Sequence, residues 1–97
     1  MIRHTVVFTL KHAEGSREEK DFMEAALKLS SIEGVHHFEC LRQISKKNAF
    51  TLGLSMKFET KKAYDEYNNH PEHLAFIENF WIRDVEDFME IDYEALQ

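Results

Sequence analysis

The sequence predicts an α+β fold in which a four-stranded antiparallel sheet carries its helices on one face. Apolar residues alternate along segments 2–10 and 50–58, and they recur at helical spacing in segments 12–34 and 71–81. The elements follow the order strand–helix–strand–strand–helix–strand, which is typical of the ferredoxin-like βαββαβ plait with its first and third strands central. We expect residues 1–97 to form a single domain of this kind.

The first and third strands each have an apolar face that we expect to pack against the helices. This face consists of Ile2, His4, Val6, Phe8 and Leu10 in the first strand and of Phe50, Leu52, Leu54, Met56 and Phe58 in the third. Segment 35–44 reads as the second strand, joined to the third through the polar turn 45–49. Segment 85–93 alternates again and completes the sheet.

The helices have recognisable ends. Ser16 followed by Glu19 fits a capping box, and Gly34 suits the C-terminal exit of the first helix. Thr60 can cap the next helix. The only proline, Pro71, interrupts that helix and starts a new one, because a proline at the first helical position loses no hydrogen bond.

Composition excludes several classes of function. The net charge is −6 and the pI is near 5.4, with no concentrated basic face, so neither nucleic acid nor an anionic membrane surface is an expected partner. No stretch approaches the roughly 20 apolar residues of a membrane span, and the N-terminus turns polar too soon for a secretory signal. The single cysteine, Cys40, suits a reducing compartment, so we expect a cytoplasmic protein.

The sheet face turned away from the helices is unusually apolar for a solvated surface. It should carry Thr5, Val7, Thr9, Thr51, Gly53 and Ser55, with Phe38 or Phe88 added. Two copies stacked sheet to sheet would bury this face, which predicts a homodimer. The alternative is a half-solvated face, which is normal for antiparallel sheets.

Two histidines and a tyrosine form the candidate site. His73 shares a helical face with Phe76, Ile77 and Phe80, and should therefore point toward the sheet. His4 should point toward the helices from the first strand, and Tyr67 should stand near the mouth of the space between them. A neutral imidazole can take a proton, and a tyrosine hydroxyl can hold a carbonyl or enolate oxygen.

Other interpretations of these residues stay open. A histidine among apolar neighbours is often a hydrogen-bonded core residue, and His70 is expected to be a helix cap or an exposed neighbour. His70 and His73 have a spacing seen in metal sites, but no third ligand is evident, so we predict no metal. Cys40 is expected to be a small buried thiol.

The segments "IRHTVVFTL", "YNNHPEHLAF" and "FWIRDVEDFMEIDY" together resemble the stress-responsive A/B-barrel, or Dabb, family over essentially the whole chain. The resemblance implies a dimeric α/β-barrel built from two plaits. It also implies a relation to a plant polyketide cyclase that performs an intramolecular aldol condensation without a cofactor. In that activity the positions of Tyr67 and His73 carry the chemistry and that of His4 lines the pocket. The cyclase has a further histidine near the position of Leu52, so the pocket here is less polar.

These observations lead to three hypotheses about function. The first is a homodimer that binds an aromatic or polyketide-like small molecule, either as a binding protein or as an enzyme without cofactors that uses His73 as base and Tyr67 as oxygen-binding partner. Its expected pocket lining is His4, Phe8, Leu52, Phe76, Ile77 and Phe80. The second is a non-enzymatic stress-response protein whose relevant property is a stable dimer. The third, a monooxygenase or haem-degrading enzyme, has no iron-ligating pattern to support it.

Overall fold

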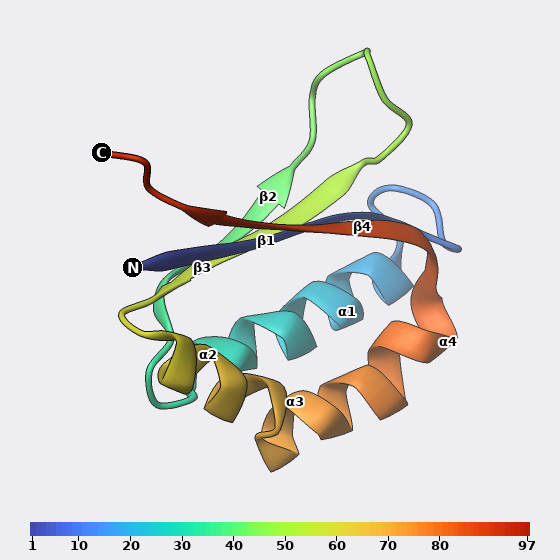
Figure 1. Cartoon of the computed structure of the whole chain (residues 1–97). Coiled ribbons are helices and arrows are strands. Elements are labelled where there is room, and N and C mark those ends of the chain that lie inside the picture. The colour runs from blue at the N-terminus through green and yellow to red at the C-terminus, as the bar shows by residue number, and fades with distance from the viewer.

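The structure, a computed structural model, describes residues 1–97 and has the predicted plait (Figure 1). The strands are β1 (Ile2–Leu10), β2 (His36–Arg42), β3 (Leu52–Phe58) and β4 (Val85–Glu94). The helices are α1 (Arg17–Leu27), α2 (Lys61–Asn68), α3 (Pro71–Phe76) and α4 (Ile82–Asp84), with a 3₁₀ turn at Lys28–Ser31 and a π-helical turn at Ile77–Trp81.

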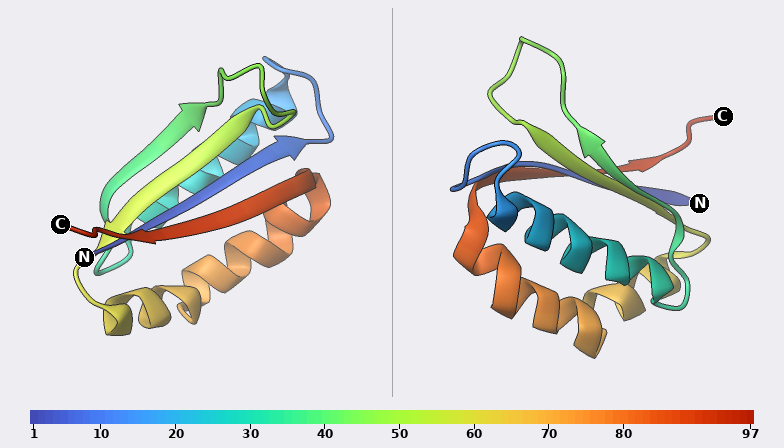
Figure 2. Two further views of the ribbon diagram at one scale, coloured as in Figure 1. Left: turned by 45° about the horizontal axis from the view of Figure 1, so that its top comes forward. Right: turned by 180° about the vertical axis from the view of Figure 1, so that it is seen from behind.

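The four strands form one antiparallel sheet in the order β2-β3-β1-β4, which confirms that the first and third strands are central. All the helices cover one face of this sheet, and Figure 2 shows α1 lying beside the run from α3 to α4 beneath it. The other face has no covering element. The α+β ferredoxin-like prediction is therefore confirmed.

The core lies between the sheet and the helices. The largest fully buried side chains include Phe8 from β1, Phe22 from α1, and Met56 and Phe58 from β3. The Phe8 and Phe22 rings are tilted with their centroids 5.5 Å apart, a geometry that aromatic pairs favour. The alternation in β1 arises because every second residue, from His4 onward, is buried against the helices.

Local signals in the sequence set most of the helix boundaries. The Ser16 hydroxyl accepts the backbone N–H of Glu19 at 3.2 Å, and the Glu19 carboxylate accepts the N–H of Gly15 at 3.2 Å. The capping box is therefore present, except that Glu19 bonds to the N–H of Gly15 and not to that of the N-cap residue Ser16. The regular part of α1 ends at Leu27, sooner than predicted, and Gly34 (φ 92°) makes the turn into β2.

The helix that starts at Pro71 continues to Asp84 through the π-helical turn. The Nδ1 atom of His70 accepts the Glu72 N–H at 3.1 Å, so the expected helix cap at His70 is confirmed. A π turn adds one residue to the helical repeat. The spacing of five residues from Phe76 to Trp81 therefore keeps both rings on the sheet-facing side, where Trp81 lies 5.1 Å from the Phe8 ring.

Three assignments of residues to the sheet were wrong. Phe50 precedes β3, because Asn48 and Gln43 side chains hold its backbone N–H and C=O in the loop. Phe38 packs against the core after an irregularity in β2 at His37, whose φ is 52°. Phe88 faces the helices, where it meets Trp81 edge to face at 5.5 Å. The uncovered face instead presents exposed apolar residues of β2 and β4, namely Leu41, Met89 and Tyr93.

None of the helices combines the length and the apolarity that crossing a bilayer requires.

Candidate functional site

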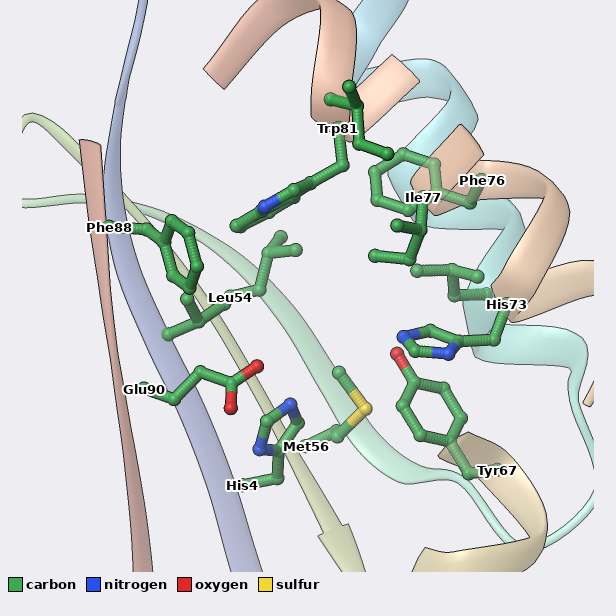
Figure 3. Close-up of a pocket in the computed structure, with 13 residues that line it drawn as sticks. His4, Leu54, Met56, Tyr67, His73, Phe76, Ile77, Trp81, Phe88 and Glu90 are labelled. Atoms are coloured by element: carbon green, nitrogen blue, oxygen red, sulfur yellow. The ribbon is translucent and has the colours of Figure 1, made fainter. Parts of the chain in front are cut away.

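A cavity of about 340 Å³ opens between the sheet and the α3 segment with its π turn (Figure 3). Its lining is mainly apolar: Val6, Leu29, Leu54, Met56, Phe76, Ile77, Trp81, Ile82 and Phe88. Four lining side chains can exchange or hold protons, and they are His4, Tyr67, His73 and Glu90. An apolar pocket with a few convergent polar groups is the usual form of a small-molecule site.

His73 and Tyr67 lie together on the helical side of the cavity. The Nδ1 atom of His73 donates to the backbone carbonyl of Asn68 at 3.1 Å, so its Nε2 carries the lone pair and is directed toward the cavity (Figure 3). The two rings have centroids 4.4 Å apart. Burial lowers the pKa of His73, which keeps its imidazole neutral near pH 7.

Tyr67 is more deeply placed than the sequence suggested, with only 2% of its surface exposed. Its ring packs on Phe58, and its hydroxyl ends beside His73 (Figure 3). Burial, with smaller contributions from Tyr64 and Glu90, raises the pKa of Tyr67 far above its usual value. The phenol therefore keeps its proton and can act as a hydrogen-bond donor.

His4 faces this pair from β1 and belongs to a hydrogen-bonded cluster. Its Nδ1 lies 2.6 Å from Asp92 Oδ1 and 3.1 Å from the Tyr64 hydroxyl. Tyr64 in turn donates to Asp92 Oδ2 at 2.7 Å. His4 and Asp92 are direct cross-strand partners in the β1–β4 pairing, which places the carboxylate beside the imidazole.

The family model described as Stress responsive A/B Barrel Domain (Dabb) matches residues 2–95. The chain belongs to the Dabb family. No curated protein matches it.

Solved structures agree with this assignment. A Dabb family protein with a ferredoxin-like fold from Mesorhizobium loti is 57% identical, with 99% of this chain and 97% of that chain covered and a TM-score of 0.96. A dimeric ferredoxin-like protein of unknown function from Bacteroides fragilis is 20% identical over 97% and 95% of the two chains, with a TM-score of 0.73. A hydroxynitrile lyase from Passiflora edulis is 15% identical over 95% and 90%, with a TM-score of 0.82. At such low identity the last two show the shared fold alone.

The structure brings some of the predicted site residues of this Dabb chain together and separates others. His4, Tyr67, His73, Phe76 and Ile77 line one cavity. Three others lie outside it: Phe8 and Leu52 are buried in the core, and Phe80 stacks on Phe76 with the Arg83 guanidinium 5.2 Å from its ring.

Several residues of the site were missed in the sequence. Asp92, Tyr64 and Glu90 reach the site only through the strand pairing and the packing of α2. The alternation of β4 could have shown that positions 88, 90 and 92 share a face. The prediction that Phe88 could lie on the face turned away from the helices pointed instead to the opposite orientation of β4.

The other histidine and cysteine side chains considered in the sequence do not form a further site in the Dabb chain. No group of three His, Cys, Asp or Glu side chains is placed to hold a metal ion. His70 is occupied as the cap of α3. Cys40 is exposed, which corrects the expectation of a buried thiol, because β2 is an edge strand.

Proposed function

We propose that this Dabb protein is a homodimer that binds a small aromatic or polyketide-like molecule between sheet and helices and performs cofactor-independent acid–base chemistry of the aldol or cyclase type. One observation carries the proposal: a neutral imidazole, His73, presents a free Nε2 to an apolar cavity beside a protonated phenol, Tyr67. The rings of Trp81 and Phe88 in the cavity wall suit an aromatic or polyketide-like molecule.

The chemistry follows from these two groups. His73 Nε2 takes a proton from a carbon next to a carbonyl group, and the Tyr67 hydroxyl donates to the oxygen on which negative charge develops. Asn68 fixes the imidazole by accepting the Nδ1 hydrogen. The mainly apolar lining strengthens these polar interactions by excluding water.

The homodimer is supported by the uncovered sheet face. Val7 of β1 lies next to Met89 of β4 and Gly53 of β3 on this face, and Leu41 lies beyond Gly53 on β2. A patch of this composition on both copies is self-complementary under a two-fold axis. The Bacteroides fragilis neighbour is described as dimeric.

Proton exchange on a simple ketone tests the proposed chemistry. We expect the protein in D₂O to speed the α-hydrogen exchange of 4-phenylbutan-2-one, followed by proton NMR, above the buffer rate. His73→Gln should lower the protein-dependent rate by about 100-fold, because a positioned base contributes roughly that factor. Tyr67→Phe should lower it by about 10-fold or more through loss of the oxygen donor.

The matched control is His36→Gln, which removes an exposed histidine of β2 that is remote from the cavity. It should exchange at the wild-type rate. Equal rates in wild type and His73→Gln would contradict the enzymatic proposal. That result would favour the second candidate, a non-enzymatic stress-response protein whose relevant property is its stable dimer; the family's description as stress responsive supports the stress-response part of this candidate.

A further inference from the structure

We propose that His4 is a second proton-transfer residue of the cavity, acting as the general acid opposite His73, and that Asp92 and Tyr64 are its positioning residues. This inference rests on the proposed function and adds that the two imidazoles have different roles, one as base and the other as acid. It implies that the cavity binds compounds with two carbonyl groups. Such a compound loses a proton from the carbon next to one carbonyl and gains a proton on the oxygen of the other. β-Hydroxyketones and the diketones that form them are the substrate class.

The geometry around His4 fixes which nitrogen is available. Asp92 Oδ1 lies 2.6 Å from Nδ1 of His4, and the second carboxylate oxygen is already taken by the Tyr64 hydroxyl at 2.7 Å. A carboxylate only accepts hydrogen bonds, so Nδ1 carries the hydrogen. The other nitrogen, Nε2, is directed into the cavity (Figure 3). Nothing in the chain hydrogen-bonds to it.

The support around His4 is rigid. The imidazole is 6% exposed and sits on the central strand β1. Its ring centroid is 5.1 Å from that of Tyr64, whose own ring stacks on the buried Phe58 at 5.1 Å. Tyr64 comes from α2 and Asp92 from β4, so two further elements hold the His4 ring from the side away from the cavity. A proton donor held in this way needs little reorganisation during the reaction.

Charges near the two imidazoles favour different roles. Carboxylates flank His4, with Asp92 bonded to its Nδ1 and Glu90 lining the cavity on the same strand. The Asp92 carboxylate holds the Nδ1 side of the His4 ring, which leaves Nε2 to exchange a proton with a molecule in the cavity. His73 has only a backbone carbonyl as partner, and burial, together with the charge of His4, lowers its pKa. The imidazole bonded to a carboxylate is therefore assigned as the proton donor, and the imidazole bonded to a backbone carbonyl as the acceptor.

Protons and electron pairs balance in an intramolecular aldol step. His73 Nε2 removes a proton from the carbon next to one carbonyl, and the resulting enolate carbon forms a bond to the carbon of a second carbonyl. The electron pair of that C=O bond moves to its oxygen, which takes the proton from His4 Nε2. Afterwards His73 is charged and His4 neutral, and exchange with water restores both. In the reverse direction His4 removes the hydroxyl proton and His73 returns one to carbon.

Two probes separate the roles. Cleavage of 4-hydroxy-4-phenylbutan-2-one to benzaldehyde and acetone, followed by the absorbance of benzaldehyde, needs both imidazoles. Exchange of 4-phenylbutan-2-one in D₂O needs only one of the two imidazoles, that of His73. We expect His4→Gln and Asp92→Asn to lower kcat for cleavage by about 100-fold with KM nearly unchanged, and to leave exchange within about 3-fold of wild type. Tyr64→Phe should also lower kcat for cleavage without changing exchange, but by a smaller factor.

The control variant is Glu86→Gln, an exposed carboxylate of the same strand, which should cleave at the wild-type rate. Nitrogen-15 NMR of the wild type adds a readout that needs no substrate, and it should show His4 with hydrogen on Nδ1. A His4 tautomer with hydrogen only on Nε2 would overturn the inference. So would normal cleavage by His4→Gln, or an equal fall of exchange and cleavage in Asp92→Asn. If the wild type does not speed the exchange of 4-phenylbutan-2-one, the proposed function on which this inference rests is itself overturned.

Discussion

The imidazole of His73 lies against the ring of Tyr67, with centroids 4.4 Å apart and planes inclined by 41°. The pair is built locally, because α2 ends just after Tyr67, the next residue supplies the carbonyl that holds His73, and α3 begins at Pro71. One short corner of the chain therefore positions both groups. The core beneath them, where Tyr67 meets Phe58, then fixes that corner against the sheet.

Replacing His73 with alanine should remove activity and leave the folded chain intact. The side chain is only half-buried, and its one hydrogen bond goes to a carbonyl at the end of α2. We expect the free energy of unfolding in urea to fall by about 1–2 kcal/mol, with no change in oligomeric state by sedimentation. Unfolding of the variant in buffer would instead make His73 a structural residue.

The pH dependence of ketone exchange should reflect the environment of His73. Burial lowers the pKa of this imidazole below its ordinary 6.5, so the base stays neutral, and exchange stays fast, as the pH falls to that value. The rate should decrease only at more acidic pH, where His73 becomes protonated. Exchange measured between pH 4.5 and 8 tests this. A rate that already falls above pH 6.5 would contradict it.

A charge on the uncovered sheet face should prevent the proposed homodimer from forming. Met89 is 51% exposed in the single chain and lies beside Val7 in the β1–β4 pairing. In a sheet-to-sheet dimer, Met89→Glu would place like charges near one another or bury them unpaired, at a cost of several kcal/mol. Sedimentation should then report a single folded chain.

The control for this prediction is Leu74→Glu, which alters a residue that is 52% exposed on α3, on the opposite side of the molecule. It should sediment like the wild type. Identical sedimentation of the two variants would show that the uncovered face is not the contact between copies.

Asp84 should contribute to resistance against acid. Its carboxylate is buried and bonds to the Arg83 guanidinium at 2.9 Å and to His12 at 3.0 Å. The Arg83 hydrogen bonds, and then His12, lower the pKa of Asp84 below its ordinary 3.8 despite burial. Because the folded-state pKa is the lower one, this stabilisation is present above pH 3.8 and is lost as the pH falls through the folded-state value.

Asp84→Asn should therefore lower the free energy of unfolding at pH 7 by about 1–2 kcal/mol, and the difference from wild type should shrink toward pH 2. Urea titrations across this range measure the effect. Asp65→Asn, which removes an exposed ion pair with Lys61, should change stability by less than about 0.5 kcal/mol. A constant difference between Asp84→Asn and wild type at every pH would rule out the linkage.

His70 should behave as a replaceable helix cap. Its Nδ1 accepts the Glu72 N–H, and α3 begins at the following residue, Pro71. His70→Ala should lower the free energy of unfolding by about 0.5–1 kcal/mol. His70→Asn should lower it by much less, because asparagine is a good N-cap. Equal losses in both variants would mean that the ring acts through packing and not through its hydrogen bond.

Local patterns predicted the plait and half of the site. The capping signals at Ser16 and Thr60, the proline at 71 and the alternation of β1 act over a few residues, so their structural consequences can be derived without the rest of the chain. The same holds for His73, whose place on the apolar side of its helix follows from helical periodicity.

Long-range packing decided the rest. Asp92 meets His4, 88 positions earlier, only because β4 pairs with β1 in one register, and a shift by one residue would turn Asp92 to the opposite face. The π turn likewise set the direction of Trp81. The sequence by itself determined the order of the elements, the starts of the helices after Ser16, Thr60 and His70, and the faces of the central strands, because these depend on neighbours in the chain. Tertiary structure alone decided which distant carboxylate and phenol reach the His4 imidazole, because strand register is a property of the whole sheet.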